Sequence, residues 1–393
     1  MNQLTSNQPS LHIVIAPDSF KGSLSAVQVA DAVEKGLLRA CPDASIRKVP
    51  IADGGEGTVE AMVTSTSGTI KRCHVHGPLG DIVESFWGIL GDGQTAVIEM
   101  AAASGLTLVS HDQRNPKITS SYGTGELIIE ALNYGCRKII IGIGGSATND
   151  GGSGMATALG ARFLGEDGHE IEPGGAALAQ LKHIDLSGMD LRIKELEILV
   201  ACDVDNPLLG RNGASAIYGP QKGASPEDVA ELDEALKNFS EVASRITGKD
   251  VCNRPGAGAA GGLGAGLMYF TNAELKSGIE IVIETTGMER LVASCDLVIT
   301  GEGKTDFQTA MGKAPTGIGA LARKYGKVAI CLSGSLGEGA DNLTNMGIQG
   351  LFSIAPGPIS IDECMRNARP LLETAAYRLA LLLKAGKNVW NPS

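Results

Sequence analysis

Short apolar runs that end in glycine and acidic residues recur along this chain. They stand at 12–16, 49–52, 198–201 and 297–300, and acidic residues follow each run closely. Runs of this length, bounded by turn residues, are typical of buried strands in parallel sheets. Ligands of open α/β sheets bind beyond the carboxyl ends of the strands, so we expect the acids to gather at one sheet edge.

Helical patterns alternate with these runs. Ser25 and Gln28 have the spacing of a capping box in front of an amphipathic helix, and a final helix is expected from 370 to 384, ended by Gly386. Three further apolar runs are predicted to be strands: 95–99, 328–332 and 350–354. A helix followed by a strand is also expected within 124–145. This alternation predicts an α/β fold with mainly parallel sheet and covering helices.

Length and composition narrow the class of protein. At 393 residues, two domains are the natural expectation. A formal net charge of −11 argues against nucleic acid or acidic membrane surfaces as partners, since both require a positive field. The 8 cysteines form no C-x-x-C pair, and no apolar run reaches membrane-spanning length. We therefore expect a cytoplasmic protein that is neither secreted nor membrane-spanning.

Three glycine-rich segments could approach a ligand. Residues 256–261 match G-x-G-x-x-G, but no apolar strand precedes them, so the dinucleotide-binding context is missing. Residues 303–305 resemble the end of a P-loop without its first glycine. Residues 142–152 follow a strong strand and lead into a helical pattern, which is the setting for main-chain amides that bind phosphate. A glycine-rich turn without a ligand is the alternative for this segment.

Charged residues gather in three loops: 18–21 and 301–313 hold both acids and lysines, and 53–56 holds two acids. Lysines suit a carboxylate or phosphate and carboxylates suit Mg²⁺, so these loops hold the groups that phosphoryl transfer requires. The alternative for the third loop is a solvated turn in which Asp306 caps a helix.

Five segments together resemble the bacterial type I glycerate kinases: 16–24, 50–58, 144–151, 202–207 and 301–313. The resemblance implies ATP-dependent phosphorylation of D-glycerate, usually at the 2-hydroxyl, in glyoxylate or sugar-acid catabolism. One departure is Lys304, where the family commonly has arginine. Lysine keeps the positive charge, but it cannot form the bidentate hydrogen bonds that arginine forms.

The resemblance also implies two α/β domains with the active site in the cleft. Residues 1–77 and 285–393 are expected to form a flavodoxin-like domain, and 78–284 an inserted domain with a core like that of restriction enzymes.

Site roles follow from what a kinase for a small hydroxy acid must hold. Asp203 is the candidate base, with Asp18 and Asp306 as alternatives, and Lys21 is a further catalytic candidate. Substrate binding is expected from Ser19, Lys21 and Lys313. ATP phosphates are expected at Gly144, Gly145, Ser146, Thr148, Gly301 and Gly303. Mg²⁺ is expected at two or more of Asp53, Glu56, Asp203 and Glu302.

Alternatives remain open for the function and for single residues. A hydroxy-acid dehydrogenase is disfavoured by the missing fingerprint context, and a non-catalytic binding protein would not require so many acids. Each acid could instead cap a helix or form a buried ion pair, and Asp150 could cap the helix after the glycine-rich turn. The sequence predicts neither the oligomeric state nor the preferred nucleotide.

Overall fold

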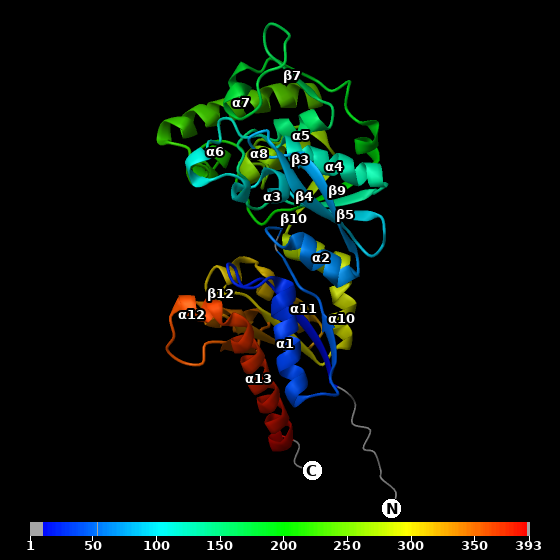
Figure 1. Cartoon of the computed structure of the whole chain (residues 1–393), viewed down its shortest axis with the longest axis vertical. Helices are drawn as coiled ribbons and strands as arrows, with labels where there is room; N and C mark the ends of the chain where they lie inside the picture. The colour runs from blue at the N-terminus through cyan, green and yellow to red at the C-terminus, as the bar shows by residue number, and fades with distance from the viewer. Residues whose placement is uncertain (1–10, 53, 391–393) are drawn as a thin grey trace, which may run out of the picture. The chain divides into compact units, whose positions relative to one another are not determined.

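The computed structural model describes residues 11–52 and 54–390, and the chain divides into two compact units (Figure 1). The first unit comprises Met1–Ala52 and Val282–Ser393, and the second is the intervening Asp53–Ile281. Helix α9 (Gly278–Thr286) runs across the second boundary. The domain boundaries predicted at 77 and 285 mark the parts of the chain that are expected to fold together. They stay a prediction.

A parallel sheet of five strands forms the centre of the first unit. Its strands are β1 (His12–Pro17), β2 (Ser45–Lys48), β11 (Leu297–Gly301), β13 (Val328–Ser333) and β15 (Gly350–Ser353). Across the sheet they lie in the order β2-β1-β11-β13-β15. Counted along the unit, this is the 2-1-3-4-5 order of flavodoxin-like folds, whose ligand binds at the switch point between the first and third strands. Here that point lies between β1 and β11.

Helices cover both faces of this sheet. They are α1 (Ala26–Ala40), α10 (Met288–Ser294), α11 (Ala314–Lys324), α12 (Ile361–Arg366) and α13 (Ala368–Trp390). The helices α1 and α13 lie side by side, and their buried residues share one apolar core with Ile13, Ile299 and Ile330 of the strands (Figure 1). The helices α10 and α11 contact the same sheet but do not belong to this core, so they cover the other face.

A mixed sheet of six strands forms the centre of the second unit, in the order β10-β9-β6-β5-β4-β3. The strands are β3 (Thr69–His76), β4 (Ile82–Ile89), β5 (Thr95–Glu99), β6 (Lys138–Gly142), β9 (Glu197–Ala201) and β10 (Ala273–Lys276). From β10 to β5 neighbouring strands are parallel, whereas β4 is antiparallel to both β5 and β3. Two short strands, β7 (Arg162–Leu164) and β8 (His183–Asp185), pair outside this sheet.

The described part of the second unit contains the α-helices α2 (Thr58–Thr66), α3 (Ala101–Ser104), α4 (Tyr122–Tyr134), α5 (Ser153–Ala158), α6 (Ala214–Tyr218), α7 (Pro226–Thr247) and α8 (Ala259–Phe270). Leu127 of α4, Met155 of α5 and Leu263 of α8 are buried in one core with strand residues such as Ile139 and Ile141. A second core joins α7 and α8, where Phe239 and Phe270 lie with ring centroids 6.1 Å apart.

Most predicted elements are confirmed, including the capping box in which Ser25 Oγ accepts from Gln28 N–H at 3.4 Å. Two expectations are wrong. Strand β2 ends at Lys48, so the apolar run 49–52 follows the strand instead of forming it. Helix α13 continues through Gly386. Of the helices in the described ranges, none combines the length and apolar character needed to cross a membrane.

Candidate functional site

Four parallel strands of the second unit end level with one another. Glu99 at the end of β5 is in register with Gly142 at the end of β6. Ala201 and Lys276 continue this line on β9 and β10. The segments that follow these strands therefore leave the sheet at one edge, where open α/β sheets bind their ligands.

Residues 143–152, which follow β6, are named the glycine loop. The segment after β5 holds this loop through two main-chain hydrogen bonds. Leu106 N–H donates to the Gly145 carbonyl at 2.9 Å, and Ala147 N–H donates to the Ser104 carbonyl at 2.9 Å. The backbone of the loop is therefore fixed on one side.

The tip of the glycine loop carries main-chain N–H groups that have no acceptor among the described residues. Gly144 and Gly145 are exposed, and Gly145 has φ +77°, in the left-handed region that favours glycine. Within the part of the chain that the structure describes, no group accepts a hydrogen bond from the N–H of Gly145 or Ser146. Successive N–H groups in such a turn form a concave site for anions. The tip can therefore donate hydrogen bonds to a phosphate oxygen.

The hydroxyl groups of the glycine loop point inward. Ser146 and Thr148 are 5% and 0% exposed, and Ser146 Oγ accepts from the Thr148 N–H at 3.1 Å. The two hydroxyl oxygens lie 3.2 Å apart. These groups shape the loop, so the main chain of Ser146 is what the loop offers to a ligand.

Asp150 is a structural residue of the glycine loop. Its buried carboxylate accepts hydrogen bonds from the Ser121 N–H and hydroxyl, both at 2.8 Å, and from the N–H groups of Gly152 at 3.1 Å and Gly154 at 3.2 Å. It thereby caps the start of α5 and ties it to the start of α4. This geometry fits the helix-capping alternative for Asp150.

Lys222 is a residue of the site that sequence reasoning missed. It ends the short 3₁₀ turn Pro220–Lys222, and only 1% of the residue is exposed. Its Nζ donates to Ser146 Oγ at 3.1 Å and to the Thr148 carbonyl at 2.6 Å. Burial lowers the pKa of Lys222 to about 7, and the charge of Asp150 acts in the opposite direction.

The segment before α2 meets the same sheet edge. Gly144 N–H donates to the Gly54 carbonyl at 3.2 Å, and Glu56 is exposed two residues further on. Glu99, which sequence reasoning also missed, is buried and accepts from the Val59 N–H at 2.8 Å at the start of α2. Burial raises the pKa of Glu99, although its hydrogen bonds from main-chain N–H groups act in the opposite direction. Asp53, expected as a metal ligand, lies outside the described residues.

Asp203 follows β9 at this edge and is exposed. Its Oδ1 accepts a hydrogen bond at 2.9 Å from the N–H of Gly278, the first residue of α9. The residue therefore takes part in capping a helix while its side chain stays accessible. Both the structural role and the predicted role as a base are compatible with this geometry.

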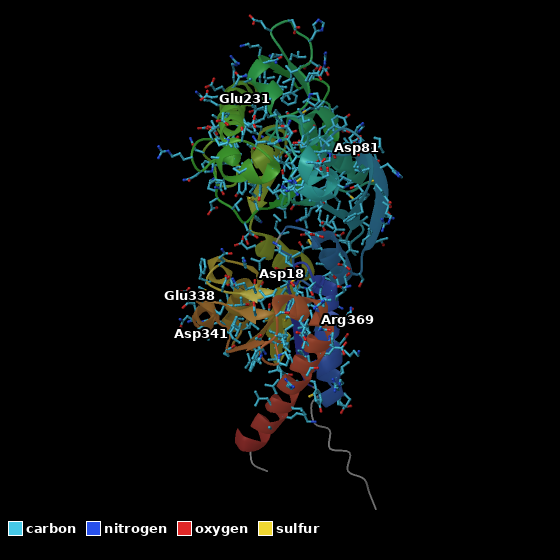
Figure 2. All side chains as sticks on the ribbon, turned by 60° about the vertical axis from the view of Figure 1, so that its left-hand side comes forward. Asp18, Asp81, Glu231, Glu338, Asp341 and Arg369 are labelled. Carbon is cyan, nitrogen blue, oxygen red and sulfur yellow. The ribbon has the colours of Figure 1, made fainter. Side chains whose placement is uncertain are left out.

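In the first unit, candidate residues stand on both sides of the switch point between β1 and β11. Asp18 N–H donates to the Gly301 carbonyl at 2.8 Å, which joins the two strand ends. Figure 2 shows Asp18 labelled on the segment that follows β1. Ser19 N–H donates to Asp18 Oδ1 at 2.6 Å, and Lys21 is exposed in the turn that follows. Asp18, Ser19 and Lys21 thus lie where a flavodoxin-like sheet binds its ligand.

Glu302 lies directly after β11 in a buried hydrogen-bond network. Its Oε1 accepts from the Thr309 hydroxyl at 2.6 Å and the Thr305 hydroxyl at 3.0 Å. Thr305 Oγ1 in turn lies 2.7 Å from Ser333 Oγ. Burial raises the pKa of Glu302, although the two threonine hydrogen bonds and the charge of Lys313 act in the opposite direction.

The rest of the 301–313 loop carries charged groups of both signs. Lys304 Nζ lies 3.0 Å from Asp306 Oδ2, and this hydrogen bond holds the pKa of Asp306 below its ordinary value. Lys313 is half-buried and occupies the N-cap position of α11. Gly303 packs beside the turn that contains Lys21. The structure thus brings Lys21, Gly301, Gly303 and Glu302 to one end of the first unit's sheet.

The described residues do not form a cation site from protein groups alone. Among residues 11–52 and 54–390, no three His, Cys, Asp or Glu side chains come together in a way that could hold a metal ion. Mg²⁺ is commonly bound by one or two carboxylates with substrate phosphates and water. Glu302 suits that mode, because no described residue donates to its Oε2.

Comparisons with known proteins find relatives that match nearly the whole chain. The sequence profile of the glycerate kinase family matches residues 13–384. The chain is 51% identical over 381 residues to the glycerate kinase of Halalkalibacterium halodurans, covering 97% of this chain and 99% of that protein. It is 52% identical over 376 residues to the glycerate 2-kinase of Escherichia coli K12, covering 96% and 99%. A crystal structure of a Salmonella typhimurium LT2 protein described as glycerate kinase 2 superposes with a TM-score of 0.88 at 49% identity, covering 96% and 100%.

Proposed function

Because this chain belongs to the glycerate kinase family and is a kinase enzyme, we propose that it transfers the γ-phosphoryl group of ATP to D-glycerate. The observation that carries the proposal is the glycine loop, whose tip presents the N–H groups of Gly145 and Ser146 at the carboxyl edge of a parallel sheet. Such amides stabilise phosphate oxygens, and phosphoryl transfer depends mainly on positioning and charge stabilisation.

The 2-hydroxyl of glycerate is the proposed acceptor. The Escherichia coli relative at 52% identity bears the name glycerate 2-kinase, which supports this choice. In the reaction the 2-hydroxyl oxygen forms a bond to the γ-phosphorus, the bond from that phosphorus to the bridging oxygen breaks, and ADP leaves. The hydroxyl proton passes to a base, for which Asp203 is proposed, with Asp18 and Asp306 as alternatives.

The remaining roles are assigned within each unit. In the second unit, Gly144, Gly145 and Ser146 are proposed to hold ATP phosphates, and the buried Thr148 is proposed to act through the shape of the loop. In the first unit, Ser19, Lys21 and Lys313 are proposed to bind the glycerate carboxylate, and Gly301 and Gly303 to approach phosphate.

Mg²⁺, bound with ATP, would neutralise charge that develops on the phosphates. Two or more of Asp53, Glu56, Asp203 and Glu302 are the proposed carboxylate ligands. The proposal places the reaction in the cytoplasm, in glyoxylate or sugar-acid catabolism.

An enzyme assay with omissions tests the proposal. The purified protein should form ADP only when D-glycerate, ATP and Mg²⁺ are all present. Reduction of a nicotinamide cofactor by D-glycerate would support the dehydrogenase alternative, and binding of glycerate without turnover would support a non-catalytic binding protein. The absence of ADP above the ATPase background would contradict the kinase proposal.

A further inference from the structure

The ammonium group of Lys222 is buried, and no carboxylate among residues 11–52 and 54–390 pairs with it. Its hydrogen bonds go to Ser146 Oγ and to the Thr148 carbonyl, and neither acceptor carries a formal charge. Asp150 acts on Lys222 only through its field, because its carboxylate accepts hydrogen bonds from other groups. Burying an unpaired charge destabilises the folded state. The packing around Lys222 therefore does not explain why a lysine stands at this position.

The position of Lys222 indicates what would balance the charge. Both of its acceptors belong to the glycine loop, whose tip carries the unbonded N–H groups of Gly145 and Ser146. A phosphate at the loop's exposed tip would meet these amides, and the ammonium lies on the buried side of the loop. Charges a few ångströms apart in partly buried surroundings interact far more strongly than they do in water.

We propose that Lys222 is the positioning residue of the nucleotide phosphate site. Its ammonium fixes the glycine loop through Ser146 and Thr148, and its positive charge strengthens the binding of ATP phosphates to the loop amides. The inference rests on the proposed function, because it takes the glycine loop as the phosphate site. It adds a residue that acts on the nucleotide through the loop and leaves glycerate binding unaffected.

The low pKa of Lys222 supports the same assignment. Burial brings this pKa to about 7, so near neutral pH the lysine is close to losing its proton. A phosphate at the loop would favour the charged form, because an opposite charge nearby stabilises the ammonium.

The chain offers a matched control in Lys249. Its Nζ also donates to two main-chain carbonyls, those of Met268 and Thr271, both at 2.8 Å. Partial burial lowers its pKa as well, although Lys249 is an exposed residue and Lys222 is a buried one. Those carbonyls lie at the carboxyl end of α8, whereas the glycine loop contacts the other end of that helix near Gly261. Replacement of Lys249 removes a comparable set of hydrogen bonds without touching the loop.

Equilibrium binding and steady-state kinetics of the full chain test the inference. Titration calorimetry with ATP and Mg²⁺, and separately with inorganic tripolyphosphate, measures phosphate binding in the absence of glycerate. Lys222→Met should weaken both ligands by about 10- to 100-fold, the range expected on losing a charged partner. It should raise KM for ATP by a similar factor and leave KM for D-glycerate unchanged. Lys249→Met should lower Tm without changing either affinity.

Two further substitutions separate charge from shape. Lys222→Gln keeps hydrogen-bond donors without charge and should also bind ATP weakly, whereas Lys222→Arg should recover part of the affinity. If Lys222→Met does not fold, Lys222→Gln decides the question. Folded Lys222→Gln with wild-type affinity for ATP overturns the assignment of Lys222 alone. A wild-type protein that binds no ATP overturns the proposed function together with this inference.

Discussion

A β-carbon on Gly142 would lie 2.4 Å from the carbonyl oxygen of Gly54. Gly142 ends β6, and Gly54 belongs to the segment that leads into α2. The same carbonyl accepts the Gly144 N–H at 3.2 Å. The absence of a side chain at Gly142 therefore lets two backbone segments meet where the glycine loop begins.

The substitution Gly142→Ala should disturb both stability and nucleotide binding. Real β-carbons do not approach a backbone oxygen so closely, so one of the two segments must shift, at a cost of about 1–3 kcal/mol. We expect a lower Tm and a higher KM for ATP. Gly386→Ala is the control, because Gly386 lies in α13 with no atom near its added β-carbon, and this change should keep or raise Tm. Unchanged stability and kinetics in Gly142→Ala would show that the close approach does not matter.

Asp203→Asn should separate the two roles that geometry allows for this residue. Asparagine can still accept the Gly278 N–H, which Asp203 Oδ1 now accepts at 2.9 Å, so Tm should change little. Loss of a general base typically lowers kcat by ~10²–10⁴-fold. Asp205→Asn, an exposed neighbour in the same loop, should retain activity. If Asp203→Asn keeps its kcat, Asp203 is a capping residue and the base is Asp18 or Asp306.

Lys21→Ala should affect glycerate binding rather than the chemical step. Lys21 is exposed in the turn that follows β1, and its proposed partner is the glycerate carboxylate. A hydrogen bond to a charged group contributes roughly 1.5–3 kcal/mol, so KM for D-glycerate should rise by about one to two decades. Lys35→Ala is the control, because this lysine of the same unit pairs with Glu373 on the surface. A normal KM for D-glycerate in Lys21→Ala would exclude this role.

Glu302→Gln should lower the activity of the protein and raise its stability. The pKa of Glu302 is raised by burial above its ordinary 4.5, so the folded state holds a proton that the unfolded chain releases. Its stabilising contribution is present below pH 4.5 and is lost as the pH rises through the folded-state pKa, by at most about 1.4 kcal/mol per pH unit.

Glutamine stays neutral, so the variant should melt at a higher temperature than wild type at pH 8, and the difference should shrink towards pH 4.5. Its Mg²⁺-dependent activity should be largely lost. Wild-type activity in folded Glu302→Gln would remove Glu302 from the proposed metal ligands.

Local sequence patterns predicted the strands well because buried strands are apolar and end in turn residues. The run 138–141 became β6, and 297–300 became β11. The run 49–52 is equally apolar, but its residues are buried in the segment that follows β2. Apolar character alone does not distinguish a buried strand from a buried segment without strand structure. Gly386 does not stop α13, since a glycine within a helix costs only about 1 kcal/mol.

The candidate site could be predicted only in part. The glycine loop and the acids after the strands are local features, so the sequence shows them. Lys222 is different, because a lysine between glutamine and glycine has the pattern of an exposed turn. Only the tertiary fold buries it under Ser146 and Thr148. The sequence pattern predicts Glu99 only as part of a strand. Its contact with the start of α2 depends on the tertiary fold as well.

Phosphorus NMR of the reaction product tests the central claim most directly. The purified protein, incubated with D-glycerate, ATP and Mg²⁺, should produce ADP and a new phosphomonoester that matches 2-phosphoglycerate. A product that is mainly 3-phosphoglycerate would contradict the proposed acceptor hydroxyl and leave the reaction class intact. The absence of any phosphoglycerate would contradict the proposal that this chain is a glycerate kinase in function.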